Sequence, residues 1–324
     1  MRVLITGIGG FAGSHLADLL VADDDCEILG VIRPGGSRAN IAHHGDRLEL
    51  IEADLTDERA VCRMLAQAQP ERIYHLAAQA SVAASWADPA GTLQANTLPQ
   101  LYLLSAMSEL CPQARVLVVG SADEYGRVPS DALPITESCA LQPTNPYALS
   151  KVNQDLMAGM FCYSHRLHIV RVRPFNHIGP RQRPGFVVPD FSRQVALIEA
   201  GLQPPLLKVG NLAARRDFCD VRDVVRAYRL ALEEGEKGAV YNICLGTSVP
   251  IQALLDRLLA LVQVEIQVER DPDRMRPSDQ PNVVGSAALL NYVTGWRPMV
   301  PLAQSLEDTL AYWRARVAAR GDAA

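Results

Sequence analysis

Short apolar runs rich in β-branched residues alternate with stretches of helical periodicity along the first half of the chain. The runs predict strands at 2–6, 27–32, 48–52, 72–76, 115–120 and 168–173. Helices are predicted at 13–22, 57–68 and 91–109, and a later helix carries Tyr147. Because strands and helices alternate, we predict an α/β fold with a Rossmann-type, doubly wound parallel sheet.

The alternation breaks near Pro174, and shorter elements follow it. Proline and glycine punctuate this part of the chain, at Pro180, Pro184, Gly185, Pro204 and Pro205. We therefore predict the doubly wound domain at 1–173 and a smaller C-terminal α/β lobe at 174–324. Part of 215–245 is predicted to return to the first domain.

Composition and charge exclude several classes of protein. The chain has 324 residues, of which 48% are hydrophobic, and a formal net charge of −5. It has no cluster of Lys and Arg interleaved with aromatic residues, so nucleic acid is not predicted as a partner. No apolar run approaches the roughly 18 residues that span a bilayer, and a strand begins at Arg2 without a signal peptide. We expect a cytoplasmic protein that does not contact membranes.

Cysteine and histidine give no sign of a metal site. The seven cysteines are scattered without a Cys-x-x-Cys pair, which argues against disulfides and thiolate ligands. His43 and His44 have no carboxylate or cysteine at ligand spacing, so we predict surface or structural roles for them.

A glycine-rich turn joins the first predicted strand to the first helix. Glycines 7, 10 and 13 enclose Phe11 and Ala12 in this turn. Glycine allows a tight turn and a close approach of the backbone to a pyrophosphate, whose charge then lies at the helix N-terminus. The spacing between strand and helix therefore predicts dinucleotide binding.

The ends of later strands refine the predicted cofactor. The second strand ends at Arg33 rather than at an acid, and a guanidinium suits a 2′-phosphate, with Ser37 or Arg38 as further contributors. This favours NADP(H), with NAD(H) as the alternative cofactor and an exposed arginine as the competing interpretation. The remaining candidate cofactor contacts follow the third and fourth strands: Asp54 and Leu55 for the adenine, and Leu76, Ala77 and Ala78 as small or apolar residues beside the cofactor.

Tyr147 and Lys151 are one helical turn apart on one face of a predicted helix. An ammonium at this spacing can lower the pKa of a phenol from about 10 and make it a usable acid. A Tyr and a Lys four residues apart are more often a solvated face. The pair therefore gains weight only together with the glycine turn and Ser121.

These motifs resemble those of the extended short-chain dehydrogenase/reductase family, and the resemblance covers essentially the whole chain. It rests on the glycine spacing, His75–Leu76–Ala77–Ala78, Ser121 four residues before Tyr125–Gly126, and Tyr147 with Lys151. It implies that Tyr147 exchanges a proton with the substrate, that Lys151 also binds the nicotinamide ribose, and that Ser121 hydrogen-bonds the reacting oxygen. Asn96 is a further cofactor contact implied by this resemblance.

The second lobe resembles the branch of that family that acts on GDP-mannose derivatives, which implies a GDP-sugar substrate. The similar segments are 173–181, 208–212 and 275–279. The residues implied to hold the nucleotide and its diphosphate are Asn176, Arg181, Lys208, Arg216 and Arg276, with Asp279 at a guanine or ribose edge. Salt bridges with Asp217, Asp220 and Asp223 are the structural alternative. Salt bridges are the better explanation for Arg215 and Arg222 than for Arg216.

The segment Ser121–Ala122–Asp123–Glu124 separates related reactions. The 4,6-dehydratases of the family carry Thr-Asp-Glu or Thr-Ser-Glu here, to remove the C5 proton and assist loss of the C6 hydroxyl. Ala122 supplies neither group, and Asp123 occupies the base position with a shorter side chain. Asp123 can instead orient the sugar, and Glu124 is expected to be structural or solvent-facing.

The resemblance therefore implies NADPH-dependent reduction of the C4 keto group of GDP-4-keto-6-deoxy-D-mannose to GDP-D-rhamnose. A GDP-mannose 4,6-dehydratase activity, or a nucleotide-sugar 4-epimerase or other reductase, stays open. A non-catalytic sensor that binds the cofactor is the alternative from another class, and the complete Ser, Tyr and Lys set argues against it.

The predicted helix after Asn96 contains Pro99, which is expected to bend the helix or delay its start. Related enzymes pair this helix with the Tyr147 helix in a four-helix bundle, which implies a homodimer. Leu98, Leu101, Leu104 and Met107 allow such a seam and equally allow packing against the sheet.

Overall fold

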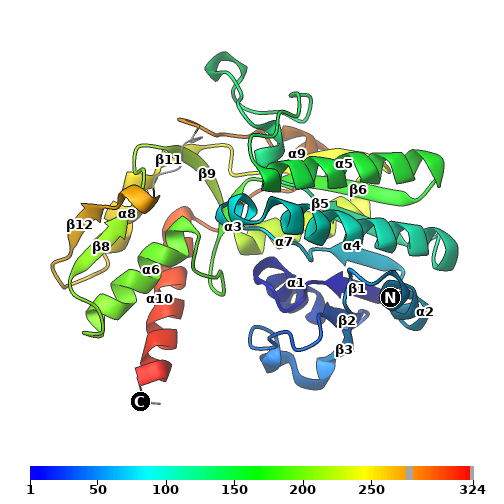
Figure 1. Ribbon diagram of the computed structural model, residues 1–324, viewed down its shortest axis with the longest axis horizontal. Coiled ribbons are helices and arrows are strands. Elements are labelled where there is room, and N and C mark those ends of the chain that lie inside the picture. Colours follow the sequence, from blue (N-terminus) through cyan, green and yellow to red (C-terminus); the bar gives the residue numbers. More distant parts are fainter. Residues whose placement is uncertain (275–279, 322–324) are drawn as a thin grey trace.

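A seven-stranded parallel sheet forms the centre of the larger part of the molecule (Figure 1). The computed structural model describes residues 1–274 and 280–321. The strand order is β10-β6-β5-β4-β1-β2-β3, and every pairing is parallel. The strands are β1 (Arg2–Thr6), β2 (Glu27–Ile32), β3 (Leu48–Glu52), β4 (Arg72–His75), β5 (Arg115–Val119), β6 (His168–Pro174) and β10 (Val240–Ile243). The predicted doubly wound sheet is confirmed.

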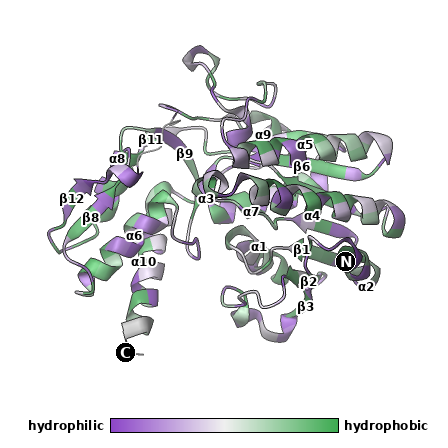
Figure 2. Ribbon diagram, in the orientation of Figure 1, coloured by the Kyte–Doolittle hydropathy of each residue, from purple (hydrophilic) through white to green (hydrophobic). Residues whose placement is uncertain are grey.

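Helices cover both faces of this sheet, as the alternation of side chains in its strands requires. Val3 and Ile5 point to one apolar core, and Leu4 between them points to the other. The strands consist mainly of hydrophobic residues (Figure 2). The first core is covered by α1 (Phe11–Val21), α7 (Val221–Glu234) and α9 (Ala288–Thr294), and the second by α2 (Glu58–Ala68), α4 (Pro89–Leu110) and α5 (Pro146–Ser164).

The chain returns to the large sheet after it has begun the second lobe. Strand β10 pairs with β6, with Val240 opposite Arg171 and Ile243 opposite Pro174. Helix α7, which precedes β10, packs Val224 and Tyr228 into the first core. The edge of the sheet beside the active-site strands is therefore built from a late part of the sequence.

The second lobe has its own core around Phe191, Leu207 and Leu254. A three-stranded sheet has the order β11-β9-β7, and a separate pair joins β12 to β8. These elements are β7 (Asn176–Ile178), β8 (Leu206–Val209), β9 (Arg215–Asp220), β11 (Ser248–Pro250), β12 (Gln267–Arg270), α6 (Val187–Glu199), α8 (Ile251–Leu259) and α10 (Leu302–Gly321).

Helix α4 runs through Pro99 without a break. It begins at Pro89, where proline is tolerated in the first turn, and the Asp88 carboxylate caps it by accepting from the Gly91 N–H at 2.9 Å. Pro99 is buried inside the helix. The expectation of a late start at Pro99 is wrong, because a capped N-terminus and packing of the helix outweigh the missing hydrogen bond. Within the described ranges, no helix combines the length and apolar character needed to cross a membrane.

Candidate active site

The glycine-rich turn between β1 and α1 has the backbone geometry that its sequence predicts. Gly7 has a φ of +70°, and a Cβ there would lie 2.9 Å from the Ala77 backbone nitrogen and Cα. A Cβ on Gly13 would overlap the Gly7 carbonyl. Gly10, the N-cap residue of α1, provides no side-chain cap. The first N–H groups of α1 therefore have no side-chain cap and are available to bind an anion. The backbone beside them can pack this closely only because these positions are glycine.

Thr6 and His75 hold the ends of β1 and β4 together. The Thr6 hydroxyl accepts the N–H groups of Leu76 at 3.1 Å and Ala77 at 3.2 Å. Its oxygen is also hydrogen-bonded to His75 Nδ1 at 2.9 Å. Burial, and then the Lys151 ammonium, lower the pKa of His75 to about 3, so this ring is neutral. Leu76 and Ala77 are half-buried and Ala78 is exposed.

The side chains predicted to contact the adenosine lie at the carboxyl ends of β2 and β3. Arg33 is exposed there, and Arg38 donates to Glu52 Oε1 at 2.8 Å. Asp54 accepts from the Thr56 hydroxyl at 2.7 Å and the Thr56 N–H at 2.9 Å, and these bonds lower the pKa of the Asp54 carboxyl. Leu55 is half-buried against the second core. Of the two arginines at this edge, Arg38 pairs with Glu52, and Arg33 has no ion pair to an acid among the described residues.

Asn96 joins the loop after β4 to helix α5. Its carbonyl oxygen accepts the Gln79 N–H at 2.7 Å, and its amide donates to the Gln79 carbonyl at 3.0 Å and to the Ser150 hydroxyl at 2.8 Å. The side chain is fully buried. Its bonds therefore fix the part of α5 that carries Lys151.

Ser121, Tyr147 and Lys151 come together beyond the carboxyl end of β5. Ser121 is the N-cap of the short 3₁₀ helix η2 (Ala122–Tyr125). Tyr147 lies in the first turn of α5, which the Asn145 side chain caps by accepting from the Ala148 N–H at 2.8 Å. The Ser121 hydroxyl lies near enough to the Tyr147 phenol to affect its pKa. Lys151 donates from Nζ to the Val119 carbonyl at 2.9 Å.

The pKa values of this group differ from the sequence prediction. Burial, followed by the Asp123 carboxylate, raises the pKa of the Tyr147 phenol, and the Ser121 hydroxyl opposes that change. The net change is therefore a rise, opposite to the lowering that the i, i+4 spacing predicts, because burial and Asp123 dominate. Burial lowers the pKa of Lys151 to about 8. At neutral pH the phenol is protonated and can donate a proton.

Glu124 is structural, and the alternative that it faces solvent is wrong. It is fully buried, and its Oε1 accepts the Ser121 N–H at 2.8 Å. The Ser121 hydroxyl in turn accepts the Asp123 N–H at 3.1 Å, which completes a capping box. Serine followed three residues later by glutamate is the pattern that would have identified it.

Three of the residues predicted to bind substrate, Asn176, Lys208 and Arg216, lie on two sheets of the second lobe. Asn176 is exposed on β7, and Arg216 lies on the neighbouring β9. Arg216 donates from Nη1 to the Gln280 carbonyl at 2.7 Å. Lys208 is exposed on β8, where the Gln194 side chain bonds both its backbone N–H and carbonyl. Arg276 and Asp279 lie outside the described residues.

The structural alternative of salt bridges is right for one arginine and wrong for another. Arg222 forms a fork with the Asp220 carboxylate at 2.8 Å for each contact. Arg215 instead donates to the Ser248 carbonyl at 2.7 Å, because β11 pairs beside it. The Asp217 carboxylate accepts backbone N–H groups from 245, 246 and 285, and burial raises its pKa to about 6.

Arg181 lies at the junction of the two lobes rather than on an open strand face. Its guanidinium pairs with the Asp18 carboxylate of α1, donates to the Asn40 carbonyl at 3.1 Å and donates to His15 Nδ1 at 2.8 Å. The other His15 nitrogen bonds the Pro180 carbonyl at 2.9 Å. The Asn40 side chain donates to the Gly9 carbonyl at 3.1 Å, so this network reaches the glycine turn.

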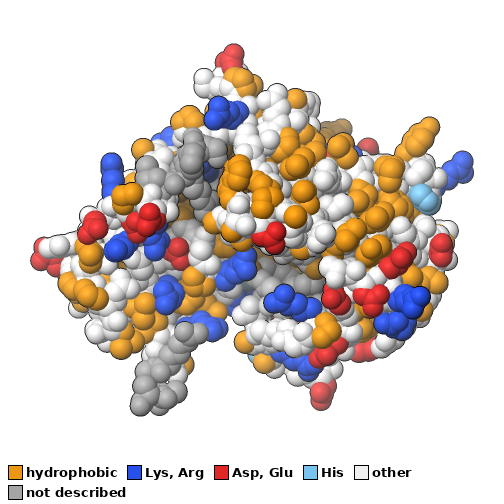
Figure 3. All heavy atoms as spheres, in the orientation of Figure 1, with side chains coloured by type: hydrophobic (Ala, Val, Ile, Leu, Met, Phe, Trp, Pro, Cys, Tyr) orange, Lys and Arg blue, Asp and Glu red, His pale blue; other side chains and the backbone are white. Residues whose placement is uncertain are grey.

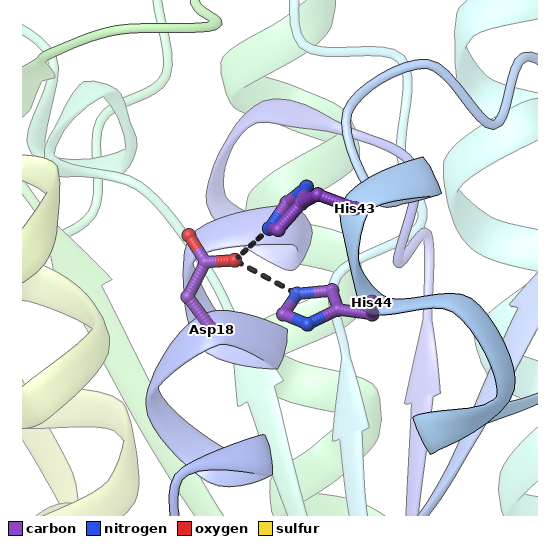
Figure 4. A group of neighbouring side chains, drawn as sticks. All are labelled: Asp18, His43 and His44. Atoms are coloured by element: carbon purple, nitrogen blue, oxygen red, sulfur yellow. Dashed lines mark hydrogen bonds and ion pairs between the residues drawn. The ribbon is translucent and has the colours of Figure 1, made fainter.

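His43 and His44 share the same carboxylate. The Nε2 atom of each ring lies 2.8 Å from Asp18 Oδ1 (Figure 4). The sequence spacing did not reveal this carboxylate, because Asp18 approaches from a distant part of the chain. The three groups have the spacing of metal ligands. The Arg181 guanidinium already pairs with this carboxylate and would oppose a second cation.

Comparison with known proteins places the chain in a family. The family model described as GDP-mannose 4,6 dehydratase matches residues 4–309. The chain belongs to this family. As its motifs predicted, it is an extended short-chain dehydrogenase/reductase, a class of NAD(P)-dependent oxidoreductases.

Several relatives of this family member are similar over nearly its whole length. GDP-6-deoxy-D-mannose reductase from Pseudomonas aeruginosa is 38% identical over 98% of both chains. GDP-mannose 4,6 dehydratase 2 from Arabidopsis thaliana is 31% identical over 92% of this chain and 82% of its own. The structure of RMD from Pseudomonas aeruginosa complexed with NADPH has a TM-score of 0.84 and 35% identity, covering 98% of this chain and 100% of its own.

Proposed function

We propose that the chain reduces the C4 keto group of GDP-4-keto-6-deoxy-D-mannose with NADPH and forms GDP-D-rhamnose. The observation that carries this proposal is the proximity of Ser121 to a protonated, buried Tyr147, beside Lys151. The similarity to GDP-6-deoxy-D-mannose reductase supports the choice of substrate.

The described residues fit a dinucleotide. The surface kept open by Gly7 and Gly13, and the uncapped start of α1, suit a pyrophosphate. Arg33 at the end of β2 suits a 2′-phosphate, and the relative complexed with NADPH agrees with NADP(H); other relatives carry NAD. The bound cofactor would supply the hydride.

The protein groups would complete the reduction by handling the charge on the carbonyl oxygen. Tyr147 donates its phenol proton to that oxygen, and Ser121 donates a hydrogen bond to it. Lys151 provides a positive charge near the phenolate that Tyr147 becomes, and by family resemblance contacts the nicotinamide ribose. Asn176, Lys208, Arg216 and Arg181 are the proposed residues of the nucleotide-sugar side. For Arg181 we propose an indirect role, since its guanidinium is engaged with Asp18.

A 4,6-dehydratase is the second candidate, and the position of Asp123 favours it. This carboxylate is close enough to Tyr147 to raise the pKa of its phenol, and it occupies the base position of the dehydratase motif. Ala122 argues against this candidate, because it cannot assist the leaving hydroxyl.

One experiment separates the two reactions. The protein is incubated with NADPH and GDP-4-keto-6-deoxymannose, and separately with GDP-mannose, while nicotinamide absorbance and product mass are followed. Oxidation of NADPH with a gain of two hydrogens in the first mixture supports the reductase. Loss of water in the second mixture, without net change in the cofactor, would replace it with the dehydratase.

We further propose a homodimer through a bundle that includes α5. Leu149, Leu156, Met160 and Tyr163 of this helix are 42%, 60%, 54% and 91% exposed, and hydrophobic side chains gather over α4 and α5 in Figure 3. Their spacing forms one helical stripe. Of the residues predicted for the seam, Leu104 and Met107 are buried in the core instead. Light scattering that gives a monomer mass at working concentration would reject this dimer.

A further inference from the structure

A buried carboxylate lies directly behind the active-site serine. Glu124 is 0% exposed, and one of its oxygens accepts the Ser121 N–H. The end of β5 is shaped around this oxygen, because a Cβ on Gly120 would overlap it. Burial of an ionisable side chain is unfavourable unless other groups compensate it, so this position calls for an explanation beyond packing.

The second oxygen of Glu124 links the active site to three other elements. Glu124 Oε2 lies 3.0 Å from Nε of Arg173, a buried arginine on β6. The same guanidinium donates to Asp155 Oδ2 of α5 at 2.8 Å and to the Tyr125 hydroxyl at 3.0 Å. Tyr125 donates in turn to Asn242 of β10 at 2.7 Å. Glu124 therefore anchors the Ser121 turn to β6, α5 and β10.

The charges that face Glu124 come from three elements. Asp155 and Lys151 lie on α5 and Arg173 lies on β6, and Asp123 shares its own turn. Burial, and then Asp155, raise the pKa of Glu124 to about 7, against the effect of Arg173 and the Ser121 N–H. Glu124 is in turn the group that opposes the lowering of the Lys151 pKa by burial. Both groups also bond one short backbone segment, Glu124 at the Ser121 N–H and Lys151 at the Val119 carbonyl.

We propose that Glu124 is a positioning residue for the reduction: it fixes the Ser121 turn and places its carboxylate against the same short backbone segment, 119–121, that holds the Lys151 ammonium. This inference rests on the proposed function for its link to turnover. The link from Glu124 to Lys151 can be measured without turnover. A failure of the proposed function and a failure of this inference can therefore be told apart.

The direct test is a titration of Lys151. The chain contains three lysines, Lys151, Lys208 and Lys237, so protein labelled with ¹³C at lysine Cε gives three signals. Lys208→Arg and Lys237→Arg assign them. Removing the charge in Glu124→Gln should lower the Lys151 midpoint by about half a pH unit or more. An unchanged midpoint in a folded Glu124→Gln protein overturns the proposal.

Two matched variants separate charge from packing. Glu124→Asp keeps the charge but shortens the reach to Ser121, so the Lys151 midpoint should stay while turnover falls. Asp155→Asn removes a charge from the same cluster that does not contact Ser121, and should leave the midpoint in place. A shift in Asp155→Asn as large as that in Glu124→Gln contradicts a specific role for Glu124. Glu124→Leu serves as the second charge-removing variant if the amide variant folds poorly.

Turnover provides the second readout. In Glu124→Gln the alkaline limb of kcat against pH should move down with the Lys151 midpoint, while KM for the GDP-sugar changes less than about twofold. If kcat falls equally at every pH and the alkaline limb does not move, Glu124 has only a structural role and the proposal is overturned. If the wild-type protein does not oxidise NADPH with this substrate, the proposed function fails while the titration still decides the coupling.

Discussion

Two of the clusters that pair a carboxylate with an arginine, one behind Ser121 and one at the junction of the lobes, are built in different ways. Glu124, Arg173 and Asp155 lie behind Ser121 with side chains at most 5% exposed. The junction of Asp18 and Arg181 is more open, at 34% and 14% exposed, with His43 at its rim. Water screens charges in the second cluster but scarcely in the first. The two arginine–carboxylate pairs should therefore contribute differently to the free energy of unfolding and to its dependence on pH.

The largest effect should lie outside both clusters. Tyr147→Phe removes the proton donor, and kcat should fall about 10²- to 10⁴-fold, while cofactor binding and the urea midpoint change little. Stopped-flow or steady-state NADPH oxidation gives the rate, and fluorescence titration gives the NADPH affinity. A rate within twofold of wild type would remove Tyr147 from the mechanism. This variant shows how far kcat falls when the proton donor is removed and both charge clusters stay intact.

The next effect tests the buried cluster. Arg173→Met leaves the buried Glu124 carboxylate without its cation and takes away one of the two arginines that pair with Asp155, the other being Arg171. This should lower the free energy of unfolding by about 3–5 kcal/mol. Urea unfolding followed by circular dichroism measures it. The matched change at the junction, Arg181→Met, should lose much less. Equal losses would show that burial does not distinguish the clusters.

A third prediction uses the sign of the pH dependence. Because the folded-state pKa of Glu124 is raised from 4.5 to about 7, the native state binds the extra proton, and stability falls as pH rises from 4.5 to 7. Glu124→Gln should remove roughly 2–3 kcal/mol of this fall. The comparison is of unfolding free energies at pH 5 and pH 7.5 in both proteins. Parallel pH profiles for the two proteins would contradict it.

The smallest effect belongs to the open junction. Although burial alone would raise the pKa of Asp18, hydrogen bonds from Arg181 and His43 lower it, so its contribution is present above about pH 4 and lost below. Asp18→Asn should lower stability by about 1 kcal/mol or less at neutral pH. The difference should shrink further in 1 M salt. Thermal unfolding with and without salt measures it; a salt-independent loss of several kcal/mol would place this pair with the buried ones.

The sequence predicted those parts of the site that depend on local order. The glycine spacing at 7, 10 and 13 determines the turn, and the order of strands brings Ser121 and Tyr147 to one edge of the sheet. The partner of His43 and His44 could not be predicted, because Asp18 is brought to them by tertiary packing. The burial of Tyr147 likewise depends on tertiary packing, so the i, i+4 spacing to Lys151 alone gave the wrong direction for the pKa of the phenol. The spacing of Ser121 and Glu124 indicates a capping box, but the charge of Glu124 also suggested exposure to solvent.

The return of β10 to the large sheet has a consequence for synthesis of the chain on the ribosome. Until residue 243 has emerged, one edge of β6 has no partner strand, and Tyr228 of α7 is missing from the core. An open, apolar strand edge invites pairing with other chains. A truncated protein ending at Arg173 would expose that edge permanently and should aggregate. The break in the sequence pattern near Pro174 is therefore a poor place to cut this protein in two.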